Sequence, residues 1–249
     1  MRITIEAWRQ ENHDAAGRFE TYVVEDATPE MSLLEVLDRL NDQLVARDVD
    51  PVAFDSDCRE GVCGACGIVV DGRPHGPVPN TPSCRQHLRH FPDATHLRLE
   101  PMRAGAFPVV RDLVVDRSAL DRVIEAGGHV AVDAGQAGDA DATLIPHDRS
   151  ETALDYAACI GCGACIAACP NGAAHLFAGA KLLHLAALEH GKQERGRRAR
   201  AITGQMEQDF GPCSTYGECA EVCPADIDLN AVAAVNRESL RAGFRRKPD

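Results

Sequence analysis

The chain has 249 residues, a hydrophobic fraction of 45% and a net charge of −12, so it is long enough for two compact domains with ordinary cores. Its acidic charge argues against a nucleic-acid partner, and no apolar run reaches the roughly 18 residues that would span a bilayer. The opening segment MRITIEAWRQ carries charges where a secretory signal peptide needs an apolar stretch. The odd count of 11 cysteines argues against a closed disulfide framework, so we expect a reducing cytoplasm in which grouped cysteines bind metal.

Residues 1–110 predict an α+β domain. The runs ITIEAW and FETYVVE are rich in β-branched and aromatic residues, which is typical of strands. Ser32 and Glu35 form a capping-box pattern, and a helix should follow because leucines then recur at helical spacing. GIVVDGRP predicts a strand that enters an Asp71–Gly72 turn, and HLRLEP predicts a last alternating strand.

Residues 111–249 predict a mostly helical domain. Ser118 and Asp121 indicate a helix start, and Gly127–Gly128 should end that helix. Residues 129–150 show little periodicity and predict a surface connection. Further helices are expected over residues 173–189, 195–209 and 228–244.

The first group of cysteines lies in DCREGVCGAC. Cys58, Cys63 and Cys66 have the spacing C-x4-C-x2-C, and Cys84 follows after a longer gap as the expected fourth ligand, which is the plant-type 2Fe–2S pattern. Glycines within the loop allow its backbone to approach a cluster closely; they are Gly61, Gly64 and Gly67. A four-cysteine zinc site is the alternative, although zinc sites favour paired C-x2–4-C knuckles.

The second and third groups share one template. ACIGCGACIAACP is the bacterial ferredoxin run C-x2-C-x2-C-x3-C-P, in which the fourth cysteine binds the other cluster of a two-cluster protein. CSTYGECAEVCP follows the same spacing except that Tyr216 stands where the second cysteine would be. A phenolate ligand at Tyr216 is the alternative reading, but tyrosine ionises near pH 10 and suits harder metal sites.

The rule of crossed ligands then divides these seven cysteines between two sites. The first site is a complete 4Fe–4S site with the ligands Cys159, Cys162, Cys165 and Cys223. The second has only three thiolates and predicts a 3Fe–4S cluster held by Cys169, Cys213 and Cys219. No cysteine is left over, so we assign no catalytic residue.

Three such sites in this order resemble the iron–sulfur subunit family of succinate dehydrogenase and fumarate reductase. CREGVCGAC, CIGCGACIAACP and CSTYGECAEVCP match the motifs of that family, and the resemblance covers nearly the whole chain. It implies an N-terminal β-grasp 2Fe–2S ferredoxin-like domain, residues 1–110, and a C-terminal all-α ferredoxin-like domain, residues 111–249, with the 4Fe–4S and 3Fe–4S clusters. DRSALDRVIEAGG and CPNGAAHLF are most similar to the actinobacterial branch, whose anchor is a cytochrome b with two haems.

The resemblance also implies a function and partners. In the family, a flavoprotein with covalent FAD oxidises succinate to fumarate, and single electrons pass through 2Fe–2S, 4Fe–4S and 3Fe–4S to haem or quinone. We therefore expect a flavoprotein subunit and a membrane-anchor cytochrome b subunit as partners, which carry the FAD and the haem, with menaquinone as the expected quinone. The chain itself would have no substrate-binding active site and would lie peripherally on the cytoplasmic side of the cell membrane.

Several residues near the third cysteine group have more than one interpretation. Family members with a buried quinone site often carry Trp and His where this chain has Ala174 and Ser214, so we assign no quinone-binding residue and expect quinone to bind within the anchor. His175 and His184 are interpreted as core or surface histidines rather than proton carriers. The basic run RGRRAR at 195–200 is interpreted as a solvated helix face rather than a docking patch.

Three alternative functions stay open at this point. A fumarate reductase would use the same relay in reverse, because cluster potentials and the quinone pool set the direction. A soluble polyferredoxin would need no flavoprotein, although the full helical half argues against it. A zinc-stabilised interaction module would be colourless, whereas iron–sulfur proteins are brown.

Overall fold

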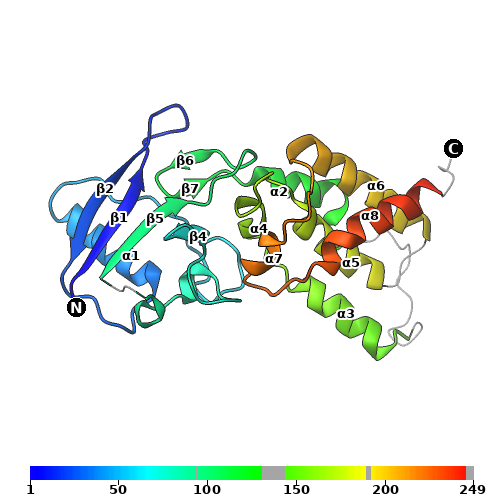
Figure 1. Cartoon of the computed structure of the whole chain (residues 1–249), viewed down its shortest axis with the longest axis horizontal. Coiled ribbons are helices and arrows are strands. Elements are labelled where there is room, and N and C mark those ends of the chain that lie inside the picture. The colour runs from blue at the N-terminus through cyan, green and yellow to red at the C-terminus, as the bar shows by residue number, and fades with distance from the viewer. Residues whose placement is uncertain (93–94, 131–143, 189–191, 245–249) are drawn as a thin grey trace.

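The computed structural model describes residues 1–92, 95–130, 144–188 and 192–244. The molecule is elongated, with a β-sheet at one end and a group of helices at the other (Figure 1). Two short helices, α4 (Ala164–Ala167) and α7 (Glu218–Glu221), lie between these ends. The predicted order of an α+β half followed by a helical half is confirmed.

A mixed five-stranded sheet forms the N-terminal half, in the order β2-β1-β5-β3-β4. Its strands are β1 (Ile3–Arg9), β2 (Arg18–Val24), β3 (Ile68–Val70), β4 (Arg73–Pro74) and β5 (His96–Pro101). β1 and β5 pair in parallel, and the other neighbours pair antiparallel. Ile3, Ile5 and Ala7 alternate along β1 and are buried, because one face of the sheet packs against helix α1 (Leu33–Val45).

The predicted capping box begins helix α1. Glu35 N–H donates to Ser32 Oγ at 3.3 Å, and Ser32 N–H donates to the Glu35 carboxylate at 2.6 Å. The backbone donor of Ser32 holds the pKa of Glu35 below its ordinary value. The expected leucine stripe faces the core; it consists of Leu33, Leu37, Leu40 and Leu44.

The predicted turn at Asp71–Gly72 joins β3 to β4. Both residues have positive φ angles, 50° and 79°, as a two-residue hairpin turn requires. A second hairpin, β6 (Val109–Arg111) with β7 (Val114–Val115), was not predicted, because strands of two or three residues are too short to show alternation. Asp112 in its turn is buried and accepts hydrogen bonds from the N–H groups of Gln10 and Ala53, both at 2.9 Å.

The helices of the C-terminal half pack around α5. Its longer elements are α2 (Ser118–Val123), the π-helical turn η3 (Ile124–Gly128), α3 (His147–Ala157), α5 (His175–Ala187), α6 (Lys192–Asp209) and α8 (Asn230–Gly243). Helix α5 packs against α3 and α8, and α6 packs against α8. A Cβ at Gly179 would lie 1.8 Å from the carbonyl oxygen of Ala231, so only glycine permits the close approach of α5 and α8.

Two details of the predicted helices are wrong. Ser118 does not cap α2 with its side chain; instead its N–H donates to Asp116 Oδ1 at 2.8 Å, and Arg117 is the N-cap residue. Helix α3 begins at His147, inside the predicted connection 129–150, of which residues 131–143 lie outside the described part. The sequence of α3 gave no clear stripe, since Ala153 is its one fully buried residue.

The basic run on α6 was also misinterpreted. Arg195 forms a two-pronged contact with Glu238 of α8, with both N···O distances 2.7 Å. Arg198 is 3% exposed and donates to Glu194 and to the carbonyl of Gly127 at 2.9 Å. The run therefore joins α6 to α8 and to η3 and is not a solvated face.

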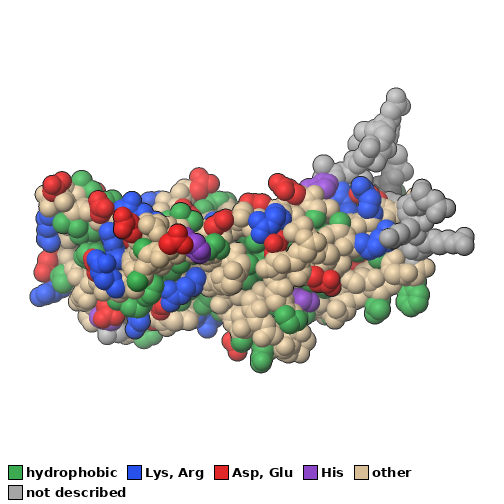
Figure 2. All heavy atoms as spheres, turned by 90° about the horizontal axis from the view of Figure 1, so that it is seen from above, with side chains coloured by type: hydrophobic (Ala, Val, Ile, Leu, Met, Phe, Trp, Pro, Cys, Tyr) green, Lys and Arg blue, Asp and Glu red, His purple; other side chains and the backbone are tan. Residues whose placement is uncertain are grey.

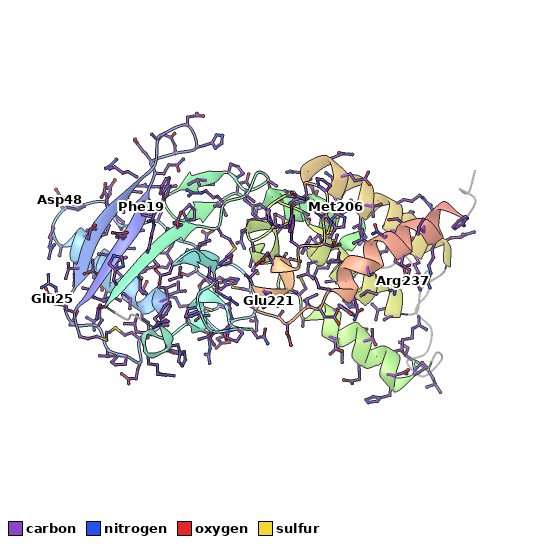
Figure 3. The ribbon with its side chains drawn as sticks, in the orientation of Figure 1. Phe19, Glu25, Asp48, Met206, Glu221 and Arg237 are labelled. Atoms are coloured by element: carbon purple, nitrogen blue, oxygen red, sulfur yellow. The ribbon has the colours of Figure 1, made fainter. Side chains whose placement is uncertain are left out.

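Two short 3-10 helices complete the described elements, η1 (Ser83–Arg85) and η2 (Leu88–His90). The two halves touch where Arg73 donates to the carbonyl of Glu221 at 2.8 Å, at the end of α7 (Figure 3). The junction thus brings the loops that carry cysteines from both halves together.

Candidate metal centres

The first cysteine group is held by the loop between α1 and β3. Cys58 and Cys63 are partly exposed, whereas Cys66 and Cys84 are buried. A hydrogen bond between the thiols of Cys66 and Cys84 brings the distant fourth cysteine to the loop. The structure therefore places all four of the predicted ligands of the first site in one region.

Backbone N–H groups of this loop point at sulfur atoms. Glu60 N–H donates to Cys58 Sγ at 3.3 Å, and Ala65 N–H donates to Cys63 Sγ at 3.4 Å. Such donors lower the pKa of Cys58 to about 7. A thiolate stabilised in this way is the form that binds iron, so the donor set fits an anionic cluster.

His75 supports the first group and was missed in the sequence. Ser83 N–H donates to His75 Nδ1 at 3.2 Å, which fixes the turn that carries Cys84. Burial lowers the pKa of His75 to about 4, so its ring is neutral. The sequence offered no signal beyond a histidine in the long gap before Cys84.

The second site is a buried cavity between α4 and the chain that follows α7. Four of the cysteines that line it are the predicted 4Fe–4S ligands, Cys159, Cys162, Cys165 and Cys223. Burial raises the pKa of Cys162 to about 12 and also raises that of Cys165. Buried thiolates need a compensating cation, and coordinated iron supplies one, so these residues fit a metal cluster.

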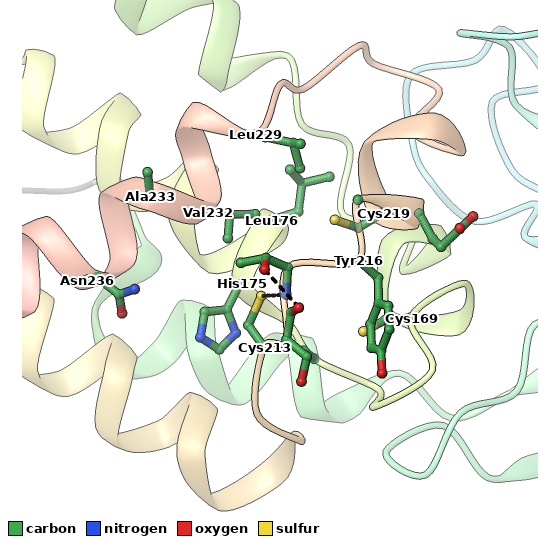
Figure 4. Close-up of a pocket in the computed structure, with 15 residues that line it drawn as sticks. Cys169, His175, Leu176, Cys213, Tyr216, Cys219, Leu229, Val232, Ala233 and Asn236 are labelled. Carbon is green, nitrogen blue, oxygen red and sulfur yellow. Dashed lines mark hydrogen bonds between the residues drawn. The ribbon is translucent and has the colours of Figure 1, made fainter.

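The third site is a separate cavity of about 290 Å³. The three predicted 3Fe–4S ligands line it together with Tyr216 (Figure 4); they are Cys169, Cys213 and Cys219. Thr215 N–H donates to Cys213 Sγ at 3.4 Å. Tyr216 is 61% exposed, so its ring extends toward solvent from the rim.

Each of these two cavities is lined by cysteines from both the second and the third cysteine groups. Cys169 belongs to the second cysteine group but faces the cavity of the third, whereas Cys223 belongs to the third group and faces the cavity of the second. The contact of α4 with α7 makes this exchange possible. Leu176 lines both cavities, so the two sites are neighbours.

A site for one metal ion was the alternative for these cysteines. In the described ranges, no three Cys, His, Asp or Glu side chains converge closely enough to hold a single ion. Zinc requires its thiolates at about 2.3 Å from one centre. The seven cysteines of the second and third groups instead line two cavities, which suits clusters of several irons.

His175 also lines the third cavity. It is half-buried, burial lowers its pKa, and its Nδ1 atom is buried without a described partner. His184 lies further along α5, where burial lowers its pKa too. Both side chains are partly buried on α5, and their interpretation as core or surface histidines stays a prediction.

Arg117 connects the first and second sites and was not identified from the sequence. Its guanidinium donates to the carbonyl oxygens of Gly64, Ala65 (3.4 Å) and Cys162 (3.2 Å). Lys181 donates to the carbonyl oxygen of Cys159 at 3.3 Å. No sequence pattern predicts that a long side chain will contact carbonyl groups that are distant along the chain.

Comparison with protein families gives two matches. A model described as "2Fe-2S iron-sulfur cluster binding domain" covers residues 4–122, and one described as "4Fe-4S dicluster domain" covers residues 158–227. They match the N-terminal mixed sheet and the helical half. The expected ferredoxin-like halves are therefore confirmed, with 2Fe–2S and 4Fe–4S binding domains in that order.

Curated relatives align over most of the chain. The succinate dehydrogenase iron–sulfur subunit of Bacillus subtilis is 31% identical over 78% of this chain and 75% of its own length. The fumarate reductase iron–sulfur subunit of Escherichia coli O6:H1 is 30% identical over 82% and 78%, and that of Wolinella succinogenes is 27% identical over 96% and 97%.

A solved structure shares the fold. A chain of the Mycobacterium smegmatis Sdh1 complex, solved in the apo form, matches with a TM-score of 0.70 and 20% identity over 96% of each chain. That likeness shows the architecture alone. The sequence identity to the curated relatives shows the family: this chain belongs to the iron–sulfur subunits of succinate dehydrogenases and fumarate reductases.

Proposed function

We propose that this chain is the electron-transfer subunit of a membrane-bound succinate:quinone oxidoreductase that oxidises succinate to fumarate. The observation that carries the proposal is the contact of three cysteine-lined sites in series. The loop of the first site touches that of the second at Gly64, where a Cβ would lie 2.2 Å from the carbonyl of Ile160. The second and third sites share Leu176.

The proposed ligands of the second and third sites follow the two sets that line separate cavities, and those of the first follow the spacing of its cysteines. Cys58, Cys63, Cys66 and Cys84 would hold 2Fe–2S; Cys159, Cys162, Cys165 and Cys223 would hold 4Fe–4S; and Cys169, Cys213 and Cys219 would hold 3Fe–4S. Bound clusters of this kind accept and release single electrons. The residues of the chain hold the sulfur ligands, donate N–H groups to them and exclude water from the buried sites.

The proposed domains are residues 1–110 and 111–249. The hairpin β6–β7 crosses this boundary and ties the halves together. Val109 and Val115 pack in the helical core, whereas Leu113 packs in the core of the N-terminal half. A shared hairpin favours a fixed relation between the first site and the other two.

The exposed side of α8 supports docking of the membrane anchor. Leu229 is 49% exposed and lines the third cavity, and Leu240 and Phe244 continue this side with exposed fractions of 64% and 89%. Charged side chains of both signs cover the N-terminal half in Figure 2, and hydrophobic ones are visible toward the helical end. An apolar surface next to the third site suits a hydrophobic partner.

The proposed assembly includes a flavoprotein with FAD and a cytochrome b anchor with haem and menaquinone, with this chain peripheral on the cytoplasmic side. Among the described helices, none is both long and apolar enough to cross a bilayer. The same relay would serve fumarate reduction, and relatives of both names are similar to this chain. Assays in both directions on the purified complex decide which reaction dominates.

Anaerobic purification of the tagged chain from its native membranes tests the proposal. We expect a brown complex that contains a flavoprotein and shows 2Fe–2S, 4Fe–4S and 3Fe–4S signals by electron paramagnetic resonance. A fully iron-loaded preparation with only one or two centres would contradict the proposal. A freely soluble carrier without a flavoprotein would support a polyferredoxin instead.

A further inference from the structure

Arg117 is the one described side chain that hydrogen-bonds to the backbone of both the first and the second cysteine loops. Its guanidinium donates to the carbonyls of Gly64 and Ala65, which lie between Cys63 and Cys66. The same group donates to the carbonyl of Cys162 at 3.2 Å. These bonds fasten the loop of the first site to that of the second.

The positive charge of Arg117 lies at the junction without a carboxylate partner. The side chain is half-buried, and the part of the chain that the structure describes places no Asp or Glu within salt-bridge distance of it. Its partners are uncharged carbonyls. Arg122 on the same helix differs, because it contacts the Asp209 carboxylate at 2.9 Å.

The first and second cysteine loops are in close contact at Gly64, so they have little room to shift relative to each other. Gly64 has φ +74°, and its backbone approaches Ile160 and Cys162 so closely that no other residue fits without displacement. The aliphatic part of Arg117 passes Gly163, whose Cβ would lie 3.7 Å from Cδ. The guanidinium therefore secures a contact that is already close.

A second cation lies across the same junction. Arg117 and Lys181 line one cavity of about 480 Å³ together with Cys63 and Cys159. Lys181 donates to the carbonyl of Cys159 at 3.3 Å, and among the described residues its ammonium group has no hydrogen bond to the backbone of the first cysteine loop. The two cations thus allow the effects on the two sites to be separated.

We propose that Arg117 is a positioning residue for electron transfer between the first and second sites, and that its positive charge raises the reduction potential of both. The inference rests on the proposed function. The transfer moves one electron from the first site to the second, with no bond formed or broken and no proton moved. Each reduced site carries one more negative charge, which a nearby cation stabilises in a partly buried environment.

Potentiometric titration of the complete complex, followed by electron paramagnetic resonance, tests the inference. In Arg117→Gln, which keeps a hydrogen-bond donor but loses the charge, both midpoints should fall. At a fixed potential, the reduced-to-oxidised ratio should fall about tenfold at the first site, which is about 59 mV for one electron. Arg117→Lys should restore most of that ratio, because it restores the charge.

Two further variants act as controls. Arg122→Gln removes the same charge five residues further along the chain, where the guanidinium contacts Asp209 and no described backbone group of either cysteine loop, so both midpoints should move less than in Arg117→Gln. Lys181→Gln should lower the midpoint of the second site more than that of the first, because Lys181 hydrogen-bonds to Cys159 but not to the first cysteine loop. A purely structural role for Arg117 would instead alter stability in Arg117→Gln and Arg117→Lys alike.

Unchanged midpoints in Arg117→Gln, in complexes that hold all three centres, would overturn the inference. Midpoints that fall equally in Arg117→Gln and Arg117→Lys would overturn it as well. If the Arg117→Gln complex does not assemble, Arg117→Lys and Lys181→Gln carry the test. A midpoint of the second site that does not move in Lys181→Gln would then count against the inference. Failure of the proposed function is separate, since it would appear as missing centres in the unmodified complex.

Discussion

The N-terminal and helical halves build their cysteine sites in different ways. The first site brings together three cysteines of one loop and a fourth from a short turn held by His75. The other two sites exchange Cys169 and Cys223 between segments that only the packed helices bring together. The first site should therefore depend on local structure, and the other two should depend on the helical core as a whole.

The largest expected effect separates the two halves. Gly179→Ala places a Cβ 1.8 Å from the Ala231 carbonyl, so α5 and α8 must move apart, at a cost of about 4 kcal/mol. We expect loss of the 4Fe–4S and 3Fe–4S signals with the 2Fe–2S signal retained. Gly204→Ala on α6 is the control, since no atom lies within 4 Å of its Cβ. Equal loss of all three signals would show that the halves do not fold independently.

The buried pair between α6 and α8 gives the next effect. Glu238 is 2% exposed and contacts Arg195, which is 28% exposed, so Glu238→Gln removes charge-assisted hydrogen bonds at a buried position and should cost about 2 kcal/mol in the free energy of unfolding. Asp50→Asn, which removes an exposed pair with Arg111, should cost under about 1 kcal/mol. Chemical denaturation followed by circular dichroism measures both changes, and equal costs would contradict the ranking.

The same carboxylate predicts a dependence on pH. Burial works to raise the pKa of Glu238, but Arg195 and Arg241 outweigh it and hold the pKa below its ordinary value of 4.5. Its stabilisation is thus present above about pH 4.5 and is lost as the pH falls through the lower folded pKa. The stability difference between the unmodified chain and Glu238→Gln should shrink on acidification; a difference that grows would contradict the sign.

A similar effect concerns the junction of the halves. Gly64→Ala adds a clash with Ile160 to a positive φ angle and should cost about 2 kcal/mol, with faster hydrogen exchange in both cysteine loops. Gly72→Ala also has a positive φ angle but meets no atom within 4 Å, so it should cost only about 1 kcal/mol. If hydrogen exchange at residues 159–163 is equally fast in both variants, the contact between Gly64 and Ile160 does not stabilise the second cysteine loop.

The smallest expected effect lies within the N-terminal half. Ser32→Ala removes the side-chain acceptor for Glu35 N–H and should cost about 1 kcal/mol. Because the change is confined to the start of α1, it should lower the melting temperature of the N-terminal half without altering the helical sites. A loss of the 3Fe–4S signal in this variant would contradict the view that the first site depends on local structure and the other two sites depend on the helical core.

Regular elements with strong periodicity could be predicted from the sequence. The capping box at Ser32 and the Asp71–Gly72 turn depend on neighbours along the chain, so their patterns were sufficient. Helix α3 was missed because it buries little, and the hairpin at Val109–Val115 was missed because its strands are short. The basic run on α6 was misread because its partner, Glu238, lies far along the chain.

For the second and third groups, spacing divided the seven cysteines into the same two sets that line the two cavities. The residues that support them could not be found in this way. His75 and Arg117 act through contacts to backbone groups that are distant in sequence. Only the folded chain shows which carbonyl or amide such a side chain reaches.

The spectrum of a Tyr216→Cys variant tests most directly the claim that the third site has three thiolates. Tyr216 lines the third cavity, so a cysteine there should complete a fourth ligand: the 3Fe–4S signal of the oxidised complex should disappear, and a second 4Fe–4S signal should appear on reduction. Tyr216→Ser should keep the 3Fe–4S signal, because it adds no thiolate. An unchanged 3Fe–4S signal in Tyr216→Cys, with the new thiol present and iron in excess, would contradict the account.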